Sequence, residues 1–510
     1  MKTFRIPYQD TQKFSRLVID YLNKDKRLKS FINHFPDIDN FEKQITTKHN
    51  HSINRKVLVE VLKQQNTDLN LSEKSERNIN DLLNKDAFTI TTGHQLCLFT
   101  GALYFLYKII STLNLAEQLQ ERFPEKSFVP VFWMATEDHD FQEINHIHLF
   151  GKEIVWDSLQ SGSVGRMNLS KFESVLHELK SVLGESEHAE KLLNLFENSY
   201  LKHQNLAQAT RYLVNELFGK YGLVIVDGDD EKLKKQFIPI MKKDVLQQGF
   251  VKTIKCCSEQ LAKDYKVQAF VRDINFFTLT AGGRELTKGG ITDKDIEDVP
   301  EKFSPNVLLR PLYQEAILPN IATIGGGAEI AYWMQLKTAF EQENIPFPIL
   351  LLRNSTLLLS EKQNQKFIDL GFGIDDIFKK EHALQKQYVF SQKSTEISLK
   401  KQRQAIEQVF VELLEKTNDI GVQNSIKAQL HKQLSALDKL EQKLIRNEKK
   451  KHEIALQQIS KIKNQLFPHN TLQERHANFI PFYLKHGDNF IEILKENLNP
   501  LNPNFVVLTL

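Results

Sequence analysis

Four polar clusters follow apolar runs of this chain, and they hold the side chains best suited to chemistry. They are Gly93-His94-Gln95, the run TEDHDFQEINHIH at 136–148, Asp227-Gly228-Asp229-Asp230, and Gly325-Gly326-Gly327-Ala328-Glu329. In open parallel sheets, ligands bind beyond the carboxyl ends of the strands. If the apolar runs are strands of one such sheet, the four clusters share one edge, and that edge is the predicted binding site.

The triplet Gly93-His94-Gln95 stands between an expected strand at 87–92 and a helical pattern that starts near Leu103. A glycine permits a tight turn there, and the free amides at the start of a helix donate hydrogen bonds to an anion. His94 or Gln95 would then point at a bound phosphate or carboxylate. A bare turn that only starts the helix is the alternative interpretation, and the triplet alone does not exclude it.

The run EDHDFQEINHIH holds four carboxylates and three histidines within twelve residues. Asp138 and Asp140 are suited to hold a substrate ammonium group, because a partly desolvated ammonium needs carboxylate partners. His139 is the candidate for proton transfer, since the unperturbed imidazole pKa lies nearest neutrality, and Asn145 would reach in from the next turn. The spacing matches no zinc signature, so no metal is predicted. A solvated loop is the alternative interpretation.

Two further places are candidates for binding. Gly326 and Gly327 would let a ligand approach the backbone, and Glu329, in a helix expected over 328–343, could accept hydrogen bonds from ribose hydroxyls or an amine. Glu329 could equally only complement the helix dipole. Arg310 in SPNVLLRPLYQE is suited to fix a carboxylate or phosphate, although a structural ion pair fits its position as well. The glycine spacing supports neither a dinucleotide fingerprint nor a P-loop.

Strands and helices alternate around these clusters, which predicts βαβ units and a parallel sheet. Sheet segments are expected within about 87–150, 222–240 and 267–355, and EIVWD at 153–157 is a further strand candidate. The stretch 267–287 alternates around Gly282-Gly283 and favours a hairpin inserted into this framework. Residues 1–86 have the pattern of small amphipathic helices.

The composition shifts between about 376 and 466, where glycine nearly vanishes and Lys, Gln and Glu dominate. Leucines recur there at steps of four and three residues, at Leu430, Leu434, Leu437, Leu440 and Leu444. We predict an antiparallel coiled-coil arm of two long helices that break near KTNDIGVQNS. The segment 467–510 ends in NFVVLTL, which is expected to return to the core as a strand.

The bulk composition narrows the class of protein. A net charge of +3 against 67 basic and 64 acidic residues gives no electrostatic argument for nucleic-acid or membrane binding. Three cysteines make no disulfide framework, and no apolar run approaches the roughly 18 residues of a membrane helix. The start lacks the apolar core of a signal peptide. A cytoplasmic protein is expected, and 510 residues predict two or three structural units.

Five ordered motifs together resemble a known family. They are TTGHQLCLFTGALYFLYKI, VPVFWMATEDHDFQEINH, GLVIVDGDD, SPNVLLRPLYQEAILPNIATIGGGAEIAYWMQLK and the late QER at 473–475. Their order and spacing are similar to those of the BshC family, the cysteine ligases of bacillithiol biosynthesis. The resemblance implies a Rossmann-like core of the class I nucleotidyltransferase type at 1–375, with connecting-peptide insertions at about 151–221 and 241–303. It also implies that the coiled coil at 376–466 makes a homodimer.

The same resemblance implies the reaction. L-cysteine would be joined by an amide bond to the amine of glucosaminyl-malate, the last step of bacillithiol biosynthesis. Gly93-His94-Gln95 lies where class I synthetases carry the HIGH motif, but its second histidine and a KMSKS-like loop are absent, so ATP is expected by analogy alone. Arg310 would clamp a carboxylate such as the malyl group. The alternatives are a non-catalytic scaffold that binds a thiol or sugar, or another nucleotidyltransferase-like protein acting through its coiled coil.

Overall fold

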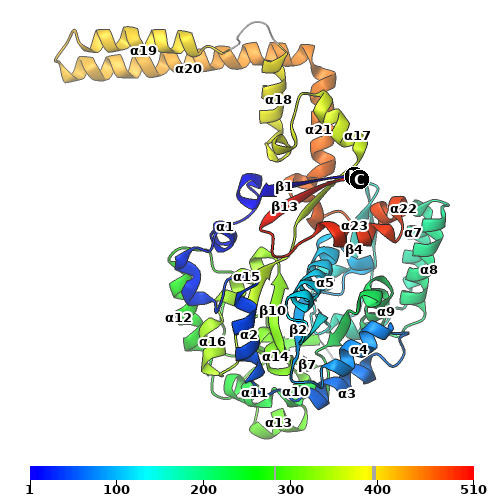
Figure 1. Cartoon of the computed structure of the whole chain (residues 1–510). Coiled ribbons are helices and arrows are strands. Elements are labelled where there is room, and N and C mark those ends of the chain that lie inside the picture. The colour runs from blue at the N-terminus through cyan, green and yellow to red at the C-terminus, as the bar shows by residue number, and fades with distance from the viewer. Residues whose placement is uncertain (281–282, 393–397) are drawn as a thin grey trace. The chain divides into compact units, whose positions relative to one another are not determined.

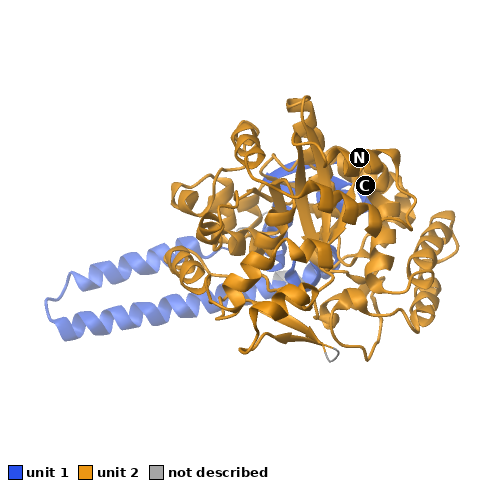
Figure 2. Ribbon diagram, turned by 90° about the horizontal axis from the view of Figure 1, so that it is seen from below, with its two compact units in different colours: residues 1–6, 357–473, 507–510 blue, residues 7–356, 474–506 orange. Residues whose placement is uncertain are grey.

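The computed structural model describes residues 1–280, 283–392 and 398–510 and forms two compact units (Figure 2). Pro7–Thr356 and Glu474–Val506 make up one of them, called here the core unit. Met1–Ile6, Leu357–Gln473 and Val507–Leu510 make up the other, called the arm unit. Neither unit is one continuous stretch of chain, because segments from both ends of the sequence join each of them.

The core unit contains the predicted parallel sheet, in which Figure 1 labels β10 and β2. The strand order of the sheet is β11-β10-β2-β3-β6. In that order the strands are Ile349–Leu352, Asn320–Gly325, Ala87–His94, Ser127–Met134 and Val224–Asp227. Neighbouring strands are parallel throughout, and β2 pairs with β3 from Ala87 opposite Ser127 to His94 opposite Met134. The α/β fold with a parallel sheet, predicted from the alternation of strands and helices, is confirmed, and it agrees with the Rossmann-like core that the resemblance implies.

Helix α5 (Tyr104–Arg122) is the crossover between β2 and β3 and packs on the sheet through apolar side chains. Leu115 and Leu119 of α5 lie in one buried cluster with Phe88 and Ile90 of β2. Burying each such side chain contributes about 1.5–3 kcal/mol, so the cluster fixes α5 on the sheet. The first turn of α5 therefore lies beside the carboxyl end of β2.

The expected small helices before the sheet are present. They are α1 (Arg16–Leu22), α2 (Asn40–His49), α3 (Arg55–Gln65) and α4 (Glu73–Asp81). The sequence pattern missed β1 (Lys2–Pro7), which joins β13 (Asn504–Thr509) and β12 (Thr356–Leu359) in a second sheet of order β1-β13-β12. Because β13 is the expected C-terminal strand, this sheet is where the end of the chain pairs with its beginning.

The stretch after β3 leaves the parallel sheet. It forms α6 (Phe141–Ile144), the antiparallel pair β4 (His146–Leu149) and β5 (Lys152–Val155), and helices α7 (Phe172–Leu183), α8 (Glu187–Leu201) and α9 (Leu206–Phe218). EIVWD thus supplies a strand, but one that pairs with β4 alone. Its short length and polar neighbours suit a hairpin outside the buried sheet, whose strands are apolar on both faces.

A second excursion lies between β6 and β10. It holds α10 (Glu231–Lys235), α11 (Ile238–Val245), α12 (Val251–Ala262), the antiparallel strands β7 (Phe276–Thr280), β8 (Gly283–Leu286) and β9 (Phe303–Pro305), α13 (Asp293–Asp298) and α14 (Arg310–Ile317). The hairpin expected at 267–287 is confirmed by the pairing of β7 with β8, while Gly282 of its turn lies outside the described residues.

The helix expected over 328–343 is two helices, α15 (Gly327–Met334) and α16 (Lys337–Gln342). Gln335 lies between them with its side chain buried, and its amide nitrogen donates to Ser258 Oγ and to the carbonyl of Ala269. The break between α15 and α16 lies at this hydrogen-bonded glutamine. Apolar periodicity alone did not predict the break.

The arm unit is mainly helical. Its helices are α17 (Glu361–Asp369), α18 (Glu381–Ser391), α19 (Lys400–Leu414), α20 (Ile420–Lys451) and α21 (Glu453–Leu466). As predicted, α19 and α20 run antiparallel along each other with a turn at 415–419, and Arg403 of α19 pairs with Asp438 of α20 (Figure 1). The pattern at 430–466 is divided between α20 and α21, which separate at His452.

Two short helices of the C-terminal segment, α22 (Ile480–His486) and α23 (Asn489–Asn497), belong to the core unit. Within the described residues, none of the helices combines the length and the apolar character needed to cross a membrane.

Candidate active site

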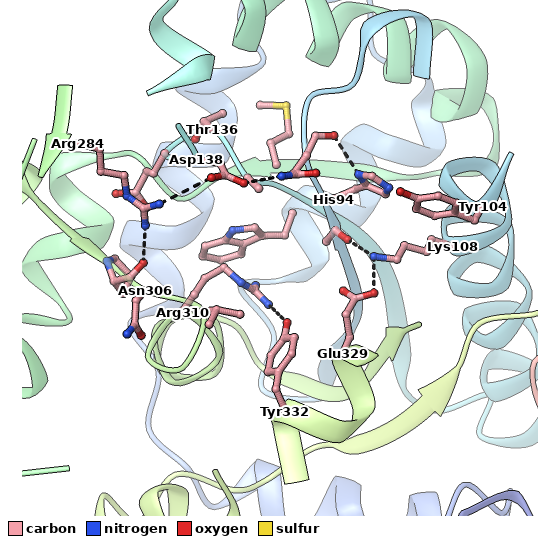
Figure 3. Close-up of a pocket in the computed structure, with 18 residues that line it drawn as sticks. His94, Tyr104, Lys108, Thr136, Asp138, Arg284, Asn306, Arg310, Glu329 and Tyr332 are labelled. Carbon is pink, nitrogen blue, oxygen red and sulfur yellow. Dashed lines mark hydrogen bonds and ion pairs between the residues drawn. The ribbon is translucent and has the colours of Figure 1, made fainter. Parts of the chain in front are cut away.

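A cavity of about 370 Å³ lies in the core unit at the carboxyl ends of β2 and β3 (Figure 3). We call it the sheet-edge cavity. Its lining residues come from five parts of the chain: Gly93, His94 and Gln95; Tyr104 and Lys108; Trp133 to Asp138; Arg284, Pro305, Asn306, Val307 and Arg310; and Glu329 and Tyr332. The position agrees with the rule for open parallel sheets, and three of the four polar clusters contribute to it.

The structure brings many of the predicted site residues together, but not all of them. Gly93, His94, Gln95, Asp138, Arg310 and Glu329 line the sheet-edge cavity, whereas His139, Asp140, Asn145, Gly326 and Gly327 do not. The roles assigned to all of these residues remain predictions.

The turn after Gly93 differs from the prediction in one respect. Helix α5 begins only at Tyr104, so the amides of Gly93 to Gln95 are not helix-start amides. The intervening loop includes Phe99, Thr100 and Gly101 in the left-handed region, with φ of 47°, 69° and 64°. The triplet therefore presents the side chains of His94 and Gln95 to the cavity, and no helix-start amides.

His94 is held in its neutral form. Burial lowers its pKa well below 6.5, and the nearby Lys108 ammonium lowers it further. The ring stacks on Tyr104 with 5.1 Å between centroids, and Nδ1 lies 3.1 Å from the carbonyl oxygen of Gln95. Because a carbonyl only accepts, Nδ1 carries the proton, and Nε2 keeps a lone pair.

The buried Lys108 forms an ion pair with the partly exposed Glu329 on one wall of the sheet-edge cavity. Its Nζ lies 2.6 Å from Oε2 of Glu329 and donates to the carbonyl of Gly93 at 2.8 Å. The same Oε2 accepts the amide of Gly326 at 2.7 Å, so Glu329 also caps α15. Burial lowers the pKa of Lys108, and Glu329 opposes that shift. A lysine within the apolar run LYFLYKII was the one sequence signal for this residue.

The opposite wall carries carboxylates. Asp138 Oδ2 accepts from Gln95 Nε2 at 2.7 Å, and Asp138 Oδ1 lies 3.8 Å from Nη1 of Arg284. Glu137 Oε1 lies 2.6 Å from Nζ of the fully buried Lys234. Although burial alone would lower the pKa of Lys234, Glu137 and Asp229 together raise it, so this amine stays protonated. Lys234 thereby balances the negative charge of Glu137. Asp138 is the other carboxylate of this wall, and it faces the cavity.

The acidic cluster at 227–230 is linked to this wall by hydrogen bonds and ion pairs. Asp229 pairs with Lys234 at 3.0 Å and with Arg166 at 2.8 Å, and Asp227 accepts from Thr136 Oγ1. None of these acidic residues lines the sheet-edge cavity. The cluster therefore serves to position the 136–138 segment, a role that the sequence did not distinguish from ligand binding.

Arg310 is the cation best placed to bind an anion. Its guanidinium donates to Gln314 Oε1 at 3.1 Å and to the Tyr332 hydroxyl at 3.4 Å, and it pairs with no carboxylate in the part of the chain that the structure describes. Arg284, which the sequence did not single out, is held by Ser304 Oγ and the Pro305 carbonyl and lies over the Phe277 ring. An incoming carboxylate or phosphate would supply the missing partner of Arg310.

The other predicted residues have different surroundings. The side chain of His139 is 48% exposed, with Nδ1 3.6 Å from Asp138 Oδ1. Asp140 is exposed before α6, and Asn145 is buried against the Trp156 carbonyl. A Cβ on Gly327 would lie 2.6 Å from Val18 Cγ2, so this glycine is required by helix packing, and close approach of a ligand does not explain it.

Replacing His94 with Gln tests its neutral state. At pH values above 6.5 the imidazole is neutral in both folded and unfolded chains, so it adds no pH dependence. Below 6.5 the unfolded chain binds a proton that the folded protein does not, and stability falls by up to about 1.4 kcal/mol per pH unit. The free energy of unfolding in urea should therefore fall less from about pH 7.5 to about pH 5.5 in His94→Gln than in the wild type. His177→Gln, an exposed control on α7, should keep the wild-type slope; equal slopes for His94→Gln would contradict the buried neutral state.

Two family models match the chain. One, described as "Bacillithiol biosynthesis BshC, N-terminal Rossmann-like domain", covers residues 1–354, and the other, described as "Bacillithiol biosynthesis BshC, C-terminal coiled-coil domain", covers residues 356–510. Together they span nearly the whole sequence, in agreement with the parallel sheet and the helical arm.

Several curated sequences are similar to this chain over nearly their whole lengths. A protein of Flavobacterium psychrophilum is 45% identical, over 100% of this chain and 99% of its own. Proteins of Christiangramia forsetii and Cytophaga hutchinsonii are 43% and 36% identical, over 100% and 98% of this chain and 99% and 97% of theirs. Each bears the name "Putative cysteine ligase BshC". The five ordered motifs, the fold and these matches agree, and the chain belongs to the BshC family of bacillithiol biosynthesis.

Proposed function

We propose that this protein is a cysteine ligase that joins the carboxyl group of L-cysteine to the amine of glucosaminyl-malate and so forms the amide of bacillithiol. The proposal rests on the family and on one feature of the sheet-edge cavity. A carboxylate, Asp138, and a cation without a carboxylate partner among the described residues, Arg310, line the same cavity of about 370 Å³. Substrates with an ammonium group at one end and a carboxylate at the other suit these two walls.

Asp138 is the proposed partner of the cysteine ammonium group. Its Oδ2 is already oriented by Gln95, and an ammonium brought into a partly desolvated cavity needs such a carboxylate. Asp140 was expected to share this role, but it lies outside the lining, so Asp138 is the stronger candidate of the two. Arg310 is the proposed clamp for a carboxylate of the malyl group or for a phosphate.

Amide formation requires activation of the carboxyl group, because an amine does not displace hydroxide from a carboxylate. ATP would supply that activation, and the wall that carries the Arg310 guanidinium fits an anionic phosphate group. The chain's own residues hold the two reactants in contact and exclude water, which raises the effective concentration of the amine at the carbonyl carbon. Hydrogen-bond donors on this wall also suit the negative charge that develops on the carbonyl oxygen.

The amine that attacks must lose a proton, and His94 is the proposed acceptor. Its imidazole lines the sheet-edge cavity, is neutral, and keeps a lone pair on Nε2. His139 was expected in this role from the sequence, but its side chain lies outside the lining. Geometry therefore favours His94, although burial lowers its pKa and makes it a weaker base than a free imidazole.

A non-catalytic scaffold is the competing function. If the chain only bound a thiol or sugar, His94, Asp138 and Glu329 would have no reason to converge on one cavity with three cations. Their convergence supports the ligase.

The reaction itself can be tested with the purified full chain, L-cysteine, glucosaminyl-malate and ATP. Mass spectrometry should detect bacillithiol only when the protein is present. In cells, deletion of the gene should make glucosaminyl-malate accumulate while bacillithiol disappears. Unchanged thiol pools in the deletion strain would argue for the scaffold.

Arg310→Ala should mainly weaken substrate binding. A hydrogen bond to a charged group contributes about 1.5–3 kcal/mol, so kcat/KM for glucosaminyl-malate should fall by roughly 10- to 100-fold, mostly through KM. Steady-state kinetics with varied glucosaminyl-malate measure this change. Arg272→Ala, an exposed control outside the lining, should leave both constants unchanged, and a loss confined to kcat in Arg310→Ala would assign the guanidinium to the chemical step.

A pair of histidine variants separates the two candidates for proton transfer. General acid–base help is worth about 10²–10⁴-fold, so His94→Gln should lower kcat by about that factor. His139→Gln should change kcat by less than about tenfold, since its ring lies outside the cavity. The comparison uses single-turnover rates with circular dichroism as a check on folding. The reverse ranking would assign the proton transfer to His139, as the sequence predicts.

We also propose that the chain is a homodimer through its coiled-coil arm. Apolar side chains of α19 and α20 remain exposed in the single chain, among them Val409, Val411, Leu440 and Leu444. Packing against a second copy of the arm would remove these apolar side chains from water. Light scattering should give the mass of two chains, and a concentration-independent monomer mass would refute the dimer.

A further inference from the structure

A second group of chemically active side chains lies on the β4–β5 hairpin of the core unit. His146 and His148 are two residues apart on β4, so their side chains project from the same face of the strand. Glu153 of β5 lies directly opposite His148 in the antiparallel register. None of the three lines the sheet-edge cavity, and none has a part in the proposed reaction.

The potential ligand atoms of these residues are already close together. One nitrogen of each histidine and one carboxylate oxygen of Glu153 all lie within 4.8 Å of one another. His148 Nε2 is 3.9 Å from Glu153 Oε1. Ligands of a tetrahedral zinc ion with bonds of about 2.0–2.1 Å are roughly 3.3 Å apart. Small side-chain rotations would therefore bring the three atoms to coordination distance.

The orientation of His146 is fixed by a buried neighbour. Asn145 is 6% exposed, and its amide nitrogen donates to the carbonyl of Trp156 at 3.3 Å. Its Oδ1 therefore faces His146 Nδ1, at 3.1 Å, as an acceptor. Nδ1 of His146 carries the proton, and Nε2 keeps the lone pair that a metal needs. Metal-binding histidines typically donate their other ring N–H to such a partner.

The orientation of the His148 ring is restricted by a second histidine. The ring of His476 stacks on it with 4.3 Å between centroids and 18° between planes, and residue 477 forms a parallel bridge with His148. His476 directly follows the Gln473–Arg475 segment in sequence. The stack restricts the rotation of the His148 ring, which lowers the entropy cost of using it as a ligand.

We propose that His146, His148 and Glu153 form a binding site for one Zn²⁺ ion, with the fourth position open to water. Two imidazoles and one carboxylate are a ligand set that zinc accepts, whereas Mg²⁺ and Ca²⁺ prefer oxygen ligands alone. The bound ion links β4 to β5 and stabilises the hairpin that follows the 136–145 segment. The site was not predicted from the sequence, because its carboxylate comes from the neighbouring strand and the spacing is no known signature.

Calorimetric titration of the full chain with ZnCl₂, after treatment with a chelator and its removal, tests the site. The wild type should bind one Zn²⁺ ion and unfold at a higher temperature when zinc is present. Co²⁺ in its place should give the visible absorption of a four-coordinate ion. His148→Ala and Glu153→Gln should each weaken Zn²⁺ binding by at least about tenfold, since each removes one of three ligands.

One control variant and the second ligand variant complete the test. His177→Ala removes an exposed histidine of α7 and should bind Zn²⁺ as the wild type does. Glu153→Gln changes only an exposed strand residue, so it remains informative if His148→Ala fails to fold. Wild-type zinc affinity in a folded Glu153→Gln variant would overturn the proposal, as would the absence of saturable binding to the wild type. Both readouts are independent of ligase activity.

Discussion

The buried ammonium of Lys108 ties together the three segments on which the sheet-edge cavity depends. It reaches from α5 to the carbonyl of Gly93 at the end of β2 and to Glu329 in the first turn of α15. A charge that is buried must be paired and hydrogen-bonded, because an uncompensated one is strongly destabilising. The helix that follows β2 and the helix that follows β10 are thus held against the same strand end.

A second buried network fixes the register beneath this point. Asn320 of β10 accepts hydrogen bonds from Thr89 and Thr91 of β2 and donates to Glu315 of α14 at 2.6 Å. Glu315 is in turn paired with the fully buried Lys48 of α2. Since these polar groups satisfy one another away from water, a shift of β10 against β2 would leave several of them unpaired. The carboxyl ends of β2 and β10 are therefore held in register with each other beside the cavity.

The C-terminal segment contributes in the same way. Glu474 is fully buried and accepts from Arg353 at 2.7 Å, from the Ser355 hydroxyl and from the amide of Thr356. Arg353 follows β11 and lies over the ring of Tyr104, which stacks on His94. The late QER motif thus acts as a structural support of the cavity wall. Because the motif lies far from the other motifs in sequence, the sequence alone did not indicate this role.

The sequence by itself determined the parts of the molecule that arise from local periodicity. The sequence predicted the apolar runs at β2, β3, β6 and β11, the two antiparallel helices of the arm and the polar clusters at strand ends. These features could be predicted because burial and helical spacing leave regular patterns. The tertiary structure decided which polar residues face the cavity. Arg284 lies in a hairpin where no local pattern marks it, and the only sign of Lys108 is its place within an apolar helical run. His139 and Asn145, by contrast, are close to Asp138 in sequence but do not line the cavity, since the direction of a loop side chain depends on contacts with distant segments.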